Sequence, residues 1–163
     1  MSEYIADLRK VVGHRTLMQV GAGVLVEDPS GRVLLELRGD TLNWAYPGGS
    51  TEIDERVEET ARRELFEETG ILAEKLELFC INSGPEVHFI YPNGDEVSNV
   101  EIVFLCRSYS GELRCQKGEV LDLRFFTPGE VKRILGTDIF PPVIPGLLKW
   151  MEERKIEGIK EIE

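Results

Sequence analysis

The chain has 163 residues, 42% of them hydrophobic and 30% charged, which is typical of a soluble globular protein. Its formal net charge of −11 at pH 7 excludes a general electrostatic attraction for nucleic acid duplexes or anionic membranes. No apolar run approaches the roughly 20 residues that cross a bilayer, and the N-terminus lacks the apolar segment of a signal peptide. We therefore expect a cytoplasmic protein whose partner is neither a membrane nor a nucleic acid duplex.

One domain is expected over residues 1–163, because no linker, repeat or low-complexity segment divides the chain. An amphipathic helix is predicted over residues 1–16, with Ile5 and Leu8 on its apolar side. A last helix is predicted over residues 145–155. Either helix could supply the contact of a homodimer or simply cover a sheet.

Between these helices the sequence predicts strands joined by turns. Two valine-rich strands are expected to form a hairpin over residues 18–38, and residues 41–49 a loop. The remaining predicted strands share a high content of β-branched and aromatic residues and span residues 76–83, 86–91, 97–109 and 119–126. A turn is expected at residues 92–95, and Thr127 caps a short helix. Strands interspersed with helices predict an α/β (α+β) domain with a mixed β-sheet between helices.

Three cysteines, Cys80, Cys106 and Cys115, are odd in number and match no metal-binding spacing. Free cysteine behaves as a small apolar side chain. We expect all three to fill core or strand positions as free thiols.

Residues 46–71, YPGGSTEIDERVEETARRELFEETGI, concentrate carboxylates in a segment whose apolar residues recur at helical spacing. A helix is predicted over residues 55–69, because Asp54 can cap its start and Gly70 can close its last turn. Like charges four residues apart destabilise a helix by a few tenths of a kcal/mol per pair. So many carboxylates on one helix therefore require an explanation.

The helical wheel directs some of these carboxylates toward the body of the domain. Glu68 falls within the aliphatic stripe, Glu64 at its edge and Glu67 further round on the same side. Arg62 and Arg63 point away on the same wheel, so Glu64 and Glu68 lack a local cation. Because inward-facing carboxylates need a compensating charge, the pattern indicates a divalent cation such as Mg²⁺. The alternative is a solvated acidic helix that binds nothing.

From Gly49 to Ile71 the segment resembles the complete signature of the Nudix hydrolases, GX5EX7REUXEEXGU, in which U is aliphatic. All nine specified positions match, and Trp44 and Pro47-Gly48 are similar to the family's W-x-x-P-G-G lead-in. The box covers 23 of the 163 residues. The resemblance implies an α/β/α sandwich, with which the predicted order of strands and helices is compatible.

The resemblance also implies a divalent metal site. In the family the box glutamates bind the cation, which transfers to Glu64, Glu67 and Glu68, and the carbonyl of Gly48 is a further ligand. Mg²⁺ is the expected ion, with Mn²⁺ as a substitute. The supporting positions share a role in holding this arrangement and are Gly49, Glu55, Arg63 and Gly70, of which the arginine orients a catalytic glutamate.

The general base is either a box residue or an acid in a later loop. Glu64 is the candidate within the box, because the edge of a buried stripe can tune its ionisation. Glu119, just before a strand, is the candidate later acid, with Asp122 behind it. A solvated loop acid without a catalytic role is the alternative for Glu119.

Substrate recognition is less marked in the sequence. Arg38 could contact a phosphate, and Trp44, Tyr46 and Phe89 could stack on a base, although core packing is expected for at least one of these aromatic residues. Pro85 is similar to the downstream proline of family members that cleave ADP-ribose, but its segment is also an ordinary turn.

The function implied by the resemblance is hydrolysis of a nucleoside diphosphate linked to another moiety, by attack of a metal-activated water on phosphorus. ADP-ribose, a nucleotide-sugar or a modified nucleoside triphosphate would be the small-molecule substrate. The alternative from another class is a non-catalytic, Nudix-like regulator that senses a nucleotide. A third reading, an isoprenoid diphosphate isomerase on the same fold, would require a cysteine in the pocket.

Overall fold

The computed structural model describes residues 2–160, with side chains as far as Lys155. Its helices and strands follow one another along the chain as α1 (Glu3–Val12), β1 (Leu17–Val26), β2 (Val33–Arg38), β3 (Trp44–Ala45), β4 (Gly48–Ser50), α2 (Val57–Thr69), β5 (Ile71–Ile90), β6 (Glu96–Gly111), β7 (Val120–Phe126), α3 (Pro128–Ile134), a short 3₁₀ helix (Pro141–Val143) and α4 (Ile144–Lys160). Among these residues no helix is long and apolar enough to span a membrane.

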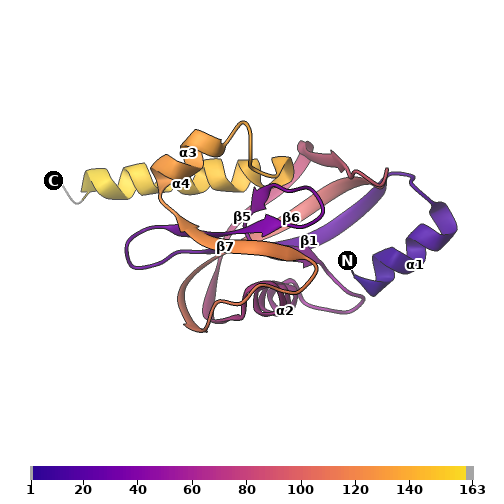
Figure 1. Cartoon of the computed structure of the whole chain (residues 1–163), viewed down its shortest axis with the longest axis horizontal. Coiled ribbons are helices and arrows are strands. Elements are labelled where there is room, and N and C mark those ends of the chain that lie inside the picture. The colour runs from indigo at the N-terminus through magenta and orange to yellow at the C-terminus, as the bar shows by residue number, and fades with distance from the viewer. Residues whose placement is uncertain (1, 161–163) are drawn as a thin grey trace.

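The strands form two sheets. One contains four strands in the order β4-β1-β6-β5, in which β1 runs parallel to β6 and the other pairs are antiparallel. The other is antiparallel, in the order β3-β2-β7. Helix α2 lies on one side of the strands, and α3 and α4 lie on the other (Figure 1). The predicted mixed sheet between helices is confirmed.

The predicted hairpin over residues 18–38 is wrong. Strands β1 and β2 meet only through one isolated bridge between Glu27 and Val33, and each then joins a different sheet. β4 pairs with residues 21–23 of β1 on one side, and β6 pairs along the whole of β1 on the other. Beyond the bridge, β2 pairs with β3 and β7 instead.

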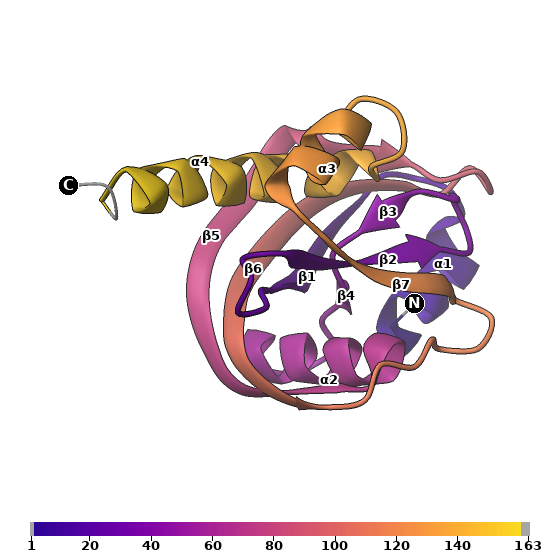
Figure 2. The same cartoon turned by 60° about the vertical axis from the view of Figure 1, so that its left-hand side comes forward.

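Several other boundaries differ from the predicted ones. The N-terminal helix ends at Val12, because Gly13 takes a positive φ of 62° that a helix cannot continue. The segment expected as a loop contains β3 and β4, and the last helix begins at Ile144 and reaches Lys160. The two strands expected between residues 76 and 91 are one, β5, which bends along β6 through several breaks in register (Figure 2).

Two clusters of buried side chains hold the layers together. On one side of the strands Phe126 packs with Leu147 and Trp150 of α4. On the other, Ala61 and Leu65 of α2 pack against the strands. Burial of a large apolar side chain contributes roughly 1.5–3 kcal/mol, so these two clusters fix α2 and α4 against opposite faces.

The cysteines are free thiols with different environments. Cys106 is buried and Cys80 is half-buried, as expected of strand residues. Cys115 is exposed, so its expected core or strand position is wrong: it lies in the irregular segment between β6 and β7, where no neighbouring layer covers it.

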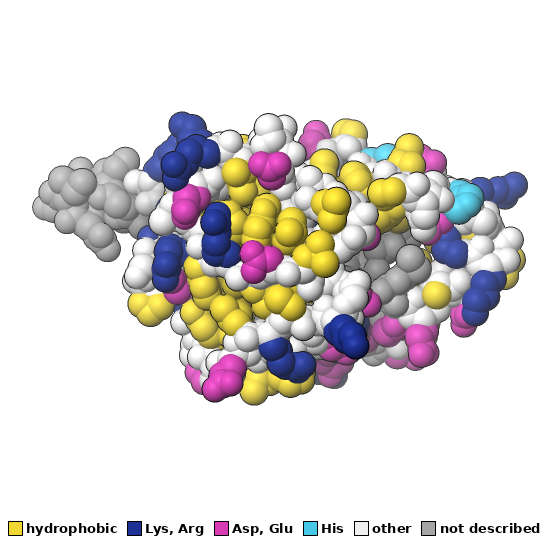
Figure 3. All heavy atoms as spheres, in the orientation of Figure 1, with side chains coloured by type: hydrophobic (Ala, Val, Ile, Leu, Met, Phe, Trp, Pro, Cys, Tyr) yellow, Lys and Arg dark blue, Asp and Glu magenta, His cyan; other side chains and the backbone are white. Residues whose placement is uncertain are grey.

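Hydrophobic side chains also gather on the surface, across the middle of the face that β7 crosses (Figure 3). Leu121 of β7 is more than half exposed. This surface does not test the homodimer expected through a terminal helix, which stays a prediction.

Candidate active site

Helix α2 is capped differently from the prediction. Asp54 does not cap it but lies in the preceding turn with a φ of 63°, and Arg56 is the N-cap residue. The N–H of Arg56 donates to Oε2 of Glu59 at 3.1 Å. Gly70 ends the helix in the left-handed conformation, with φ 76°, as predicted, and its N–H donates to the carbonyl of Phe66.

Glu68 faces inward from this helix, as the wheel predicted. Its side chain is buried, with the residue 6% exposed, and one carboxyl oxygen accepts a hydrogen bond of 2.9 Å from the N–H of Gly48. Burial raises the pKa of Glu68 well above its ordinary value, and the nearby carboxyl groups of Glu36 and Glu64 raise it further. An additional positive charge at this position would therefore be strongly favourable.

The prediction that Arg63 points away from the inward-facing glutamates is wrong. Its guanidinium lies 2.7 Å from Glu64, 2.8 Å from Glu55 and 3.4 Å from Glu67. A wheel locates the Cα–Cβ direction only, whereas the long arginine side chain extends along the helix surface and carries its charge across it. Hydrogen bonds from Arg63 lower the pKa of Glu55 to about 2.

Glu64 occupies the edge of the buried stripe as predicted and lines a cavity. Burial raises its pKa, although the contact with Arg63 opposes this. Its carboxyl group lies directly against Gly49, where a Cβ would collide with it. Gly49 is thus needed because the backbone and a carboxylate approach each other closely.

Glu36 is a further acid of this site that the sequence pattern did not indicate. It lies on β2, is only 2% exposed, and carries one carboxyl oxygen, Oε2, without a hydrogen-bond partner among the described residues. Burial raises the pKa of Glu36 to about 7, and the charge of Arg38 opposes the rise. In the segment VLLELR a single glutamate suggests a solvated face, but β2 is covered on both sides. The feature that could have indicated its burial is the position of one charged residue inside a run of aliphatic residues.

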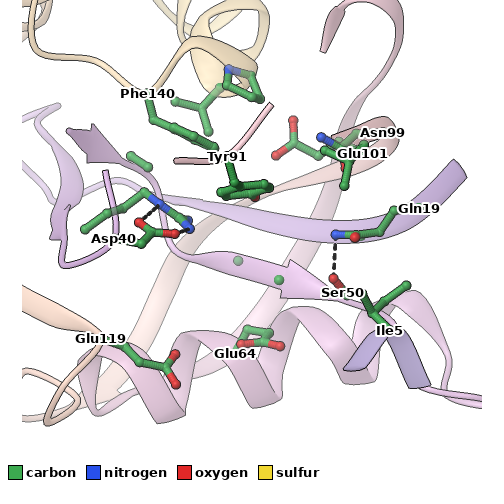
Figure 4. Close-up of a pocket in the computed structure, with 18 of the residues that line it drawn as sticks. Ile5, Gln19, Asp40, Ser50, Glu64, Tyr91, Asn99, Glu101, Glu119 and Phe140 are labelled. Carbon is green, nitrogen blue, oxygen red and sulfur yellow. Dashed lines mark hydrogen bonds and ion pairs between the residues drawn. The ribbon is translucent and has the colours of Figure 1, made fainter. Parts of the chain in front are cut away.

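These acids line one end of a cavity of about 530 Å³ between α2, the concave side of the larger sheet and the chain around Phe140. Glu36, Glu64, Glu68 and Glu119 all line it. Figure 4 shows Glu64 and Glu119 on the same side of the cavity, with Tyr91 opposite. The structure thus brings together both candidates for the general base.

Glu119 reaches the cavity from the loop before β7. Its carbonyl accepts a hydrogen bond of 2.7 Å from the N–H of Gly39, which ties this loop to the end of β2. Its side chain is exposed and borders the cavity. Asp122 is also exposed, accepts from the N–H of Leu123 and does not line the cavity.

The three predicted substrate contacts separate into different environments. Arg38 lines the cavity, donates to both oxygens of Asp40 at 3.0 and 2.6 Å, and lies 4.5 Å from the ring centroid of Phe140. Burial disfavours its charge, but the bonds to Asp40 outweigh this and raise the pKa of Arg38. Trp44 does not line the cavity and packs edge-on against Phe126.

Tyr46 lines the cavity from within the core and is 3% exposed. Its hydroxyl donates to Oε2 of Glu101 at 2.7 Å. Burial raises the pKa of Tyr46, and the charge of Glu101 raises it further. Phe89 packs against Phe140 instead of facing the cavity, and Pro85 is exposed on β5 outside it.

The chemistry of the acids fits a divalent cation. Within the described residues no three His, Cys, Asp or Glu side chains already stand as a ligand set. Glu36 nevertheless holds a buried oxygen without a partner, and Glu68 adds a second buried carboxyl group beside it. Hard cations prefer such oxygens. The positive charge beside Glu64 and Glu67 is supplied by the guanidinium of Arg63.

Comparison with known proteins identifies the family. The family model of the NUDIX domain matches residues 17–147. A MutT-like protein of Streptomyces ambofaciens is 37% identical over 110 residues, covering 68% of this chain and 64% of the relative. An NAD-capped RNA hydrolase NudC of Actinobacillus succinogenes is 32% identical over 123 residues, covering 70% of this chain and 42% of the relative. The chain thus spans less than two thirds of the length of these relatives.

Solved structures show the same architecture. The MutT NUDIX hydrolase of Burkholderia pseudomallei has a TM-score of 0.67 and 27% identity, covering 82% of this chain and 98% of that one. The NUDIX domain of Shewanella oneidensis NrtR, solved with ADP ribose, shares the fold with a TM-score of 0.68 at 16% identity, covering 94% and 99% of the two chains. With its box on α2 and a NUDIX match over residues 17–147, this chain belongs to the NUDIX domain family.

Proposed function

We propose that the protein is a pyrophosphohydrolase that cleaves a nucleoside diphosphate linked to another moiety, in a reaction that requires Mg²⁺ and accepts Mn²⁺. The observation that carries the proposal is the convergence of the box acids Glu64 and Glu68 with Glu36, Glu119 and Arg38 around one cavity. The names of the MutT-like and NudC relatives support a nucleotide-linked substrate.

Charge explains why a cation is required. The protein has a net charge of −11, and the cavity end formed by α2 is acidic, so a diphosphate would be repelled there without one. Glu64 and Glu68 would hold the ion with the carbonyl of Gly48, and Glu67, which is exposed outside the cavity, would join them from the same helix. Glu36 would add its charge beside Glu68. When bound, the cation would neutralise phosphate oxygens and lower the pKa of a water molecule.

The chain's own residues would position the reactants. Arg38 is the cavity's cation on the β2 side and is fixed by Asp40, so it would contact the phosphates of the substrate. Glu64 or Glu119 would accept the proton of the attacking water, because both carboxyl groups border the cavity. Arg63 would orient Glu64 through their ion pair. Hydrolysis of a phosphoanhydride depends mainly on such positioning and charge compensation.

The test compares wild-type protein with Glu68→Gln on ADP-ribose, nucleotide-sugars and nucleoside triphosphates in the presence of Mg²⁺. Glutamine replaces the carboxyl group without changing its volume, so circular dichroism should show an unchanged fold. We expect the rate to fall by well over tenfold. Glu58→Gln, an exposed change on the same helix, is the matched control and should leave the rate unchanged.

Two results would contradict the proposal. Equal turnover by Glu68→Gln would remove the role assigned to the buried box glutamate. Nucleotide binding without turnover of any substrate would favour the nucleotide-sensing regulator.

A further inference from the structure

Another carboxyl group outside the box, that of Glu101, lines the cavity. Glu101 lies on β6 between Gly21 of β1 and Asn82 of β5, its partners in the sheet. Two donors hold the same oxygen of this side chain, Oε2: the hydroxyl of Tyr46 at 2.7 Å and the amide nitrogen of Asn82 at 3.3 Å. The carboxyl group is therefore fixed in one orientation.

The other carboxyl oxygen of Glu101, Oε1, accepts no hydrogen bond from the described residues. It is also not among their fully enclosed, unpartnered atoms. The neighbouring strand carries Gly21 and Gly23 beside it, and a Cβ at Gly23 would stand 3.2 Å from Oε1. The same Cβ would lie 2.5 Å from the ring of Tyr46, so this ring packs against Gly23 beside Glu101, and both side chains line the cavity.

The neighbouring amides also present acceptors. The amide nitrogen of Gln19 donates to Ser50 at 2.6 Å, and that of Asn99 donates to the carbonyl of Val87 at 3.0 Å. Both residues line the cavity (Figure 4). Each amide nitrogen carries a second N–H, so each side chain offers a ligand one donor as well as its carbonyl oxygen. With Glu101, this end of the cavity therefore combines a carboxyl acceptor with two amide groups.

If Tyr46 and Glu101 only filled space in the core, their hydrogen-bonded pair would be an unfavourable choice. Burial raises the pKa of Glu101 to about 7, so its ionised form is destabilised in the folded protein. Two apolar side chains in place of Tyr46 and Glu101 would fill the core without this destabilisation. A ligand that donates to Oε1 would compensate the charge.

The nature of that ligand follows from its place. Phosphates would be repelled by this carboxylate and belong near Arg38 and the box acids. The ligand group here is a donor carried by the uncharged part of the substrate. Tyr91 lines the same cavity near Arg38 and Asp40 (Figure 4).

We propose that Glu101, oriented by Tyr46 and Asn82, accepts a hydrogen bond from the exocyclic amino group of the substrate's nucleobase and thereby selects adenine or cytosine over hypoxanthine or uracil. The inference rests on the proposed function, because it assigns the nucleotide part of that substrate. In the same pose, a base with a carbonyl in place of the amino group would place two acceptors against each other, and its neighbouring ring N–H would reach Oε1 only if the base shifted. Loss of a hydrogen bond to a charged group corresponds to about 10- to 100-fold in affinity.

The experiment measures binding of mononucleotides by calorimetry at pH 8, above the pKa of Glu101 of about 7, so that the carboxyl group is ionised and the result does not depend on turnover. AMP is compared with IMP, and CMP with UMP, since each pair differs at the amino group. We expect the amino-bearing member to bind about tenfold or more tightly. In Glu101→Gln, the carbonyl oxygen of the glutamine still accepts from Tyr46, and its amide nitrogen takes the place of the free carboxyl oxygen. The preference for the amino-bearing base should therefore disappear or reverse. Tyr46→Phe should weaken the preference while keeping the carboxylate.

The control is Glu77→Gln, which removes one charge from an exposed position on β5 and should leave both ratios unchanged. Equal affinities within each wild-type pair, or no binding of any mononucleotide, would overturn the inference. A preference for AMP over dAMP that exceeds the AMP to IMP ratio would assign Glu101 to the ribose instead and overturn it as well. Failure of the proposed hydrolysis would appear separately, as selective binding without turnover.

Discussion

The guanidinium of Arg63 lies 2.7 Å from Oε1 of Glu64 and at the same time donates to both carboxyl oxygens of Glu55, at 2.8 and 3.0 Å. Glu55 in turn accepts from the N–H of Glu52 and the hydroxyl of Thr60. Arg63 thus links a carboxyl group fixed at the start of α2 to one that borders the cavity. This geometry depends on the planar fork of arginine, which a point charge does not reproduce.

Arg63→Lys should therefore lower kcat by about 10- to 100-fold with a smaller change in KM. The lysine keeps the positive charge but cannot bind Glu55 with two parallel hydrogen bonds while reaching Glu64. Steady-state kinetics on the best substrate would measure the effect. Arg62→Lys, an exposed change at the next position, is the control, and a kcat for Arg63→Lys equal to that of the control would contradict the orienting role.

Gly49→Ala should reduce activity strongly and stability moderately. The added methyl group would collide with the carboxyl group of Glu64, and an overpacked site of this kind destabilises by about 1–3 kcal/mol. Urea unfolding would give the stability and initial rates the activity. Gly129→Ala, at a position where a Cβ meets nothing within 4 Å, is the matched control. Unchanged activity in Gly49→Ala would show that Glu64 moves away without consequence.

Glu36→Gln should weaken binding of Mn²⁺, followed by electron paramagnetic resonance, by about fivefold to tenfold, because the unpartnered buried oxygen loses its charge. The substitution preserves volume in a position 2% exposed, so the fold should be retained. Glu130→Gln changes an equal charge at the distant N-terminus of α3 and should leave the affinity as it is. An unchanged Mn²⁺ affinity in Glu36→Gln would mean that the carboxyl group of Glu36 does not contribute to metal binding.

The pH dependence of stability provides a test of the burial of Glu101. Burial raises its pKa from 4.5 to about 7, whereas hydrogen bonds from Tyr46 and Asn82 favour the charged form. Between these two pH values the folded protein binds more protons than the unfolded chain, so the free energy of unfolding falls as the pH rises. The full shift corresponds to about 3 kcal/mol.

Urea unfolding of metal-free protein at pH 5 and pH 8 would measure this contribution. Glu101→Gln cannot ionise, so its stability relative to wild type should improve at pH 8 compared with pH 5, by up to about 3 kcal/mol. Glu77→Gln removes an exposed charge and should show no such improvement. The same relative stability of Glu101→Gln at both values would mean that the carboxyl group ionises without difficulty in the folded state.

The local features of the site could be predicted from the sequence. The helix between residues 55 and 69, its end at Gly70 and the inward direction of Glu68 follow from helical spacing and from the left-handed conformation that glycine adopts. The turn at residues 92–95 and the cap at Thr127 are equally local. In each case the residues that interact are separated by only a few positions, so spacing alone defines their geometry.

The remaining features were decided by contacts between distant segments. Arg63 turns toward Glu64 because Glu55 and the strand at Ser50 accept its hydrogen bonds, which a wheel of one helix does not contain. Strands β1 and β2 separate after one bridge because β1 pairs with β4 and β6, whereas β2 pairs with β3 and β7. Trp44 is partly buried against the core because Phe126, more than eighty positions later, packs against it.

The sequence by itself determined the acidic helix and the family to which it belongs, because the box is a continuous segment with its own helical period. Only the tertiary structure decided that Glu36 and Glu101 are enclosed in one cavity with that helix. Burial is a property of what covers a residue. The layers that cover these two glutamates come from parts of the chain far from them in sequence.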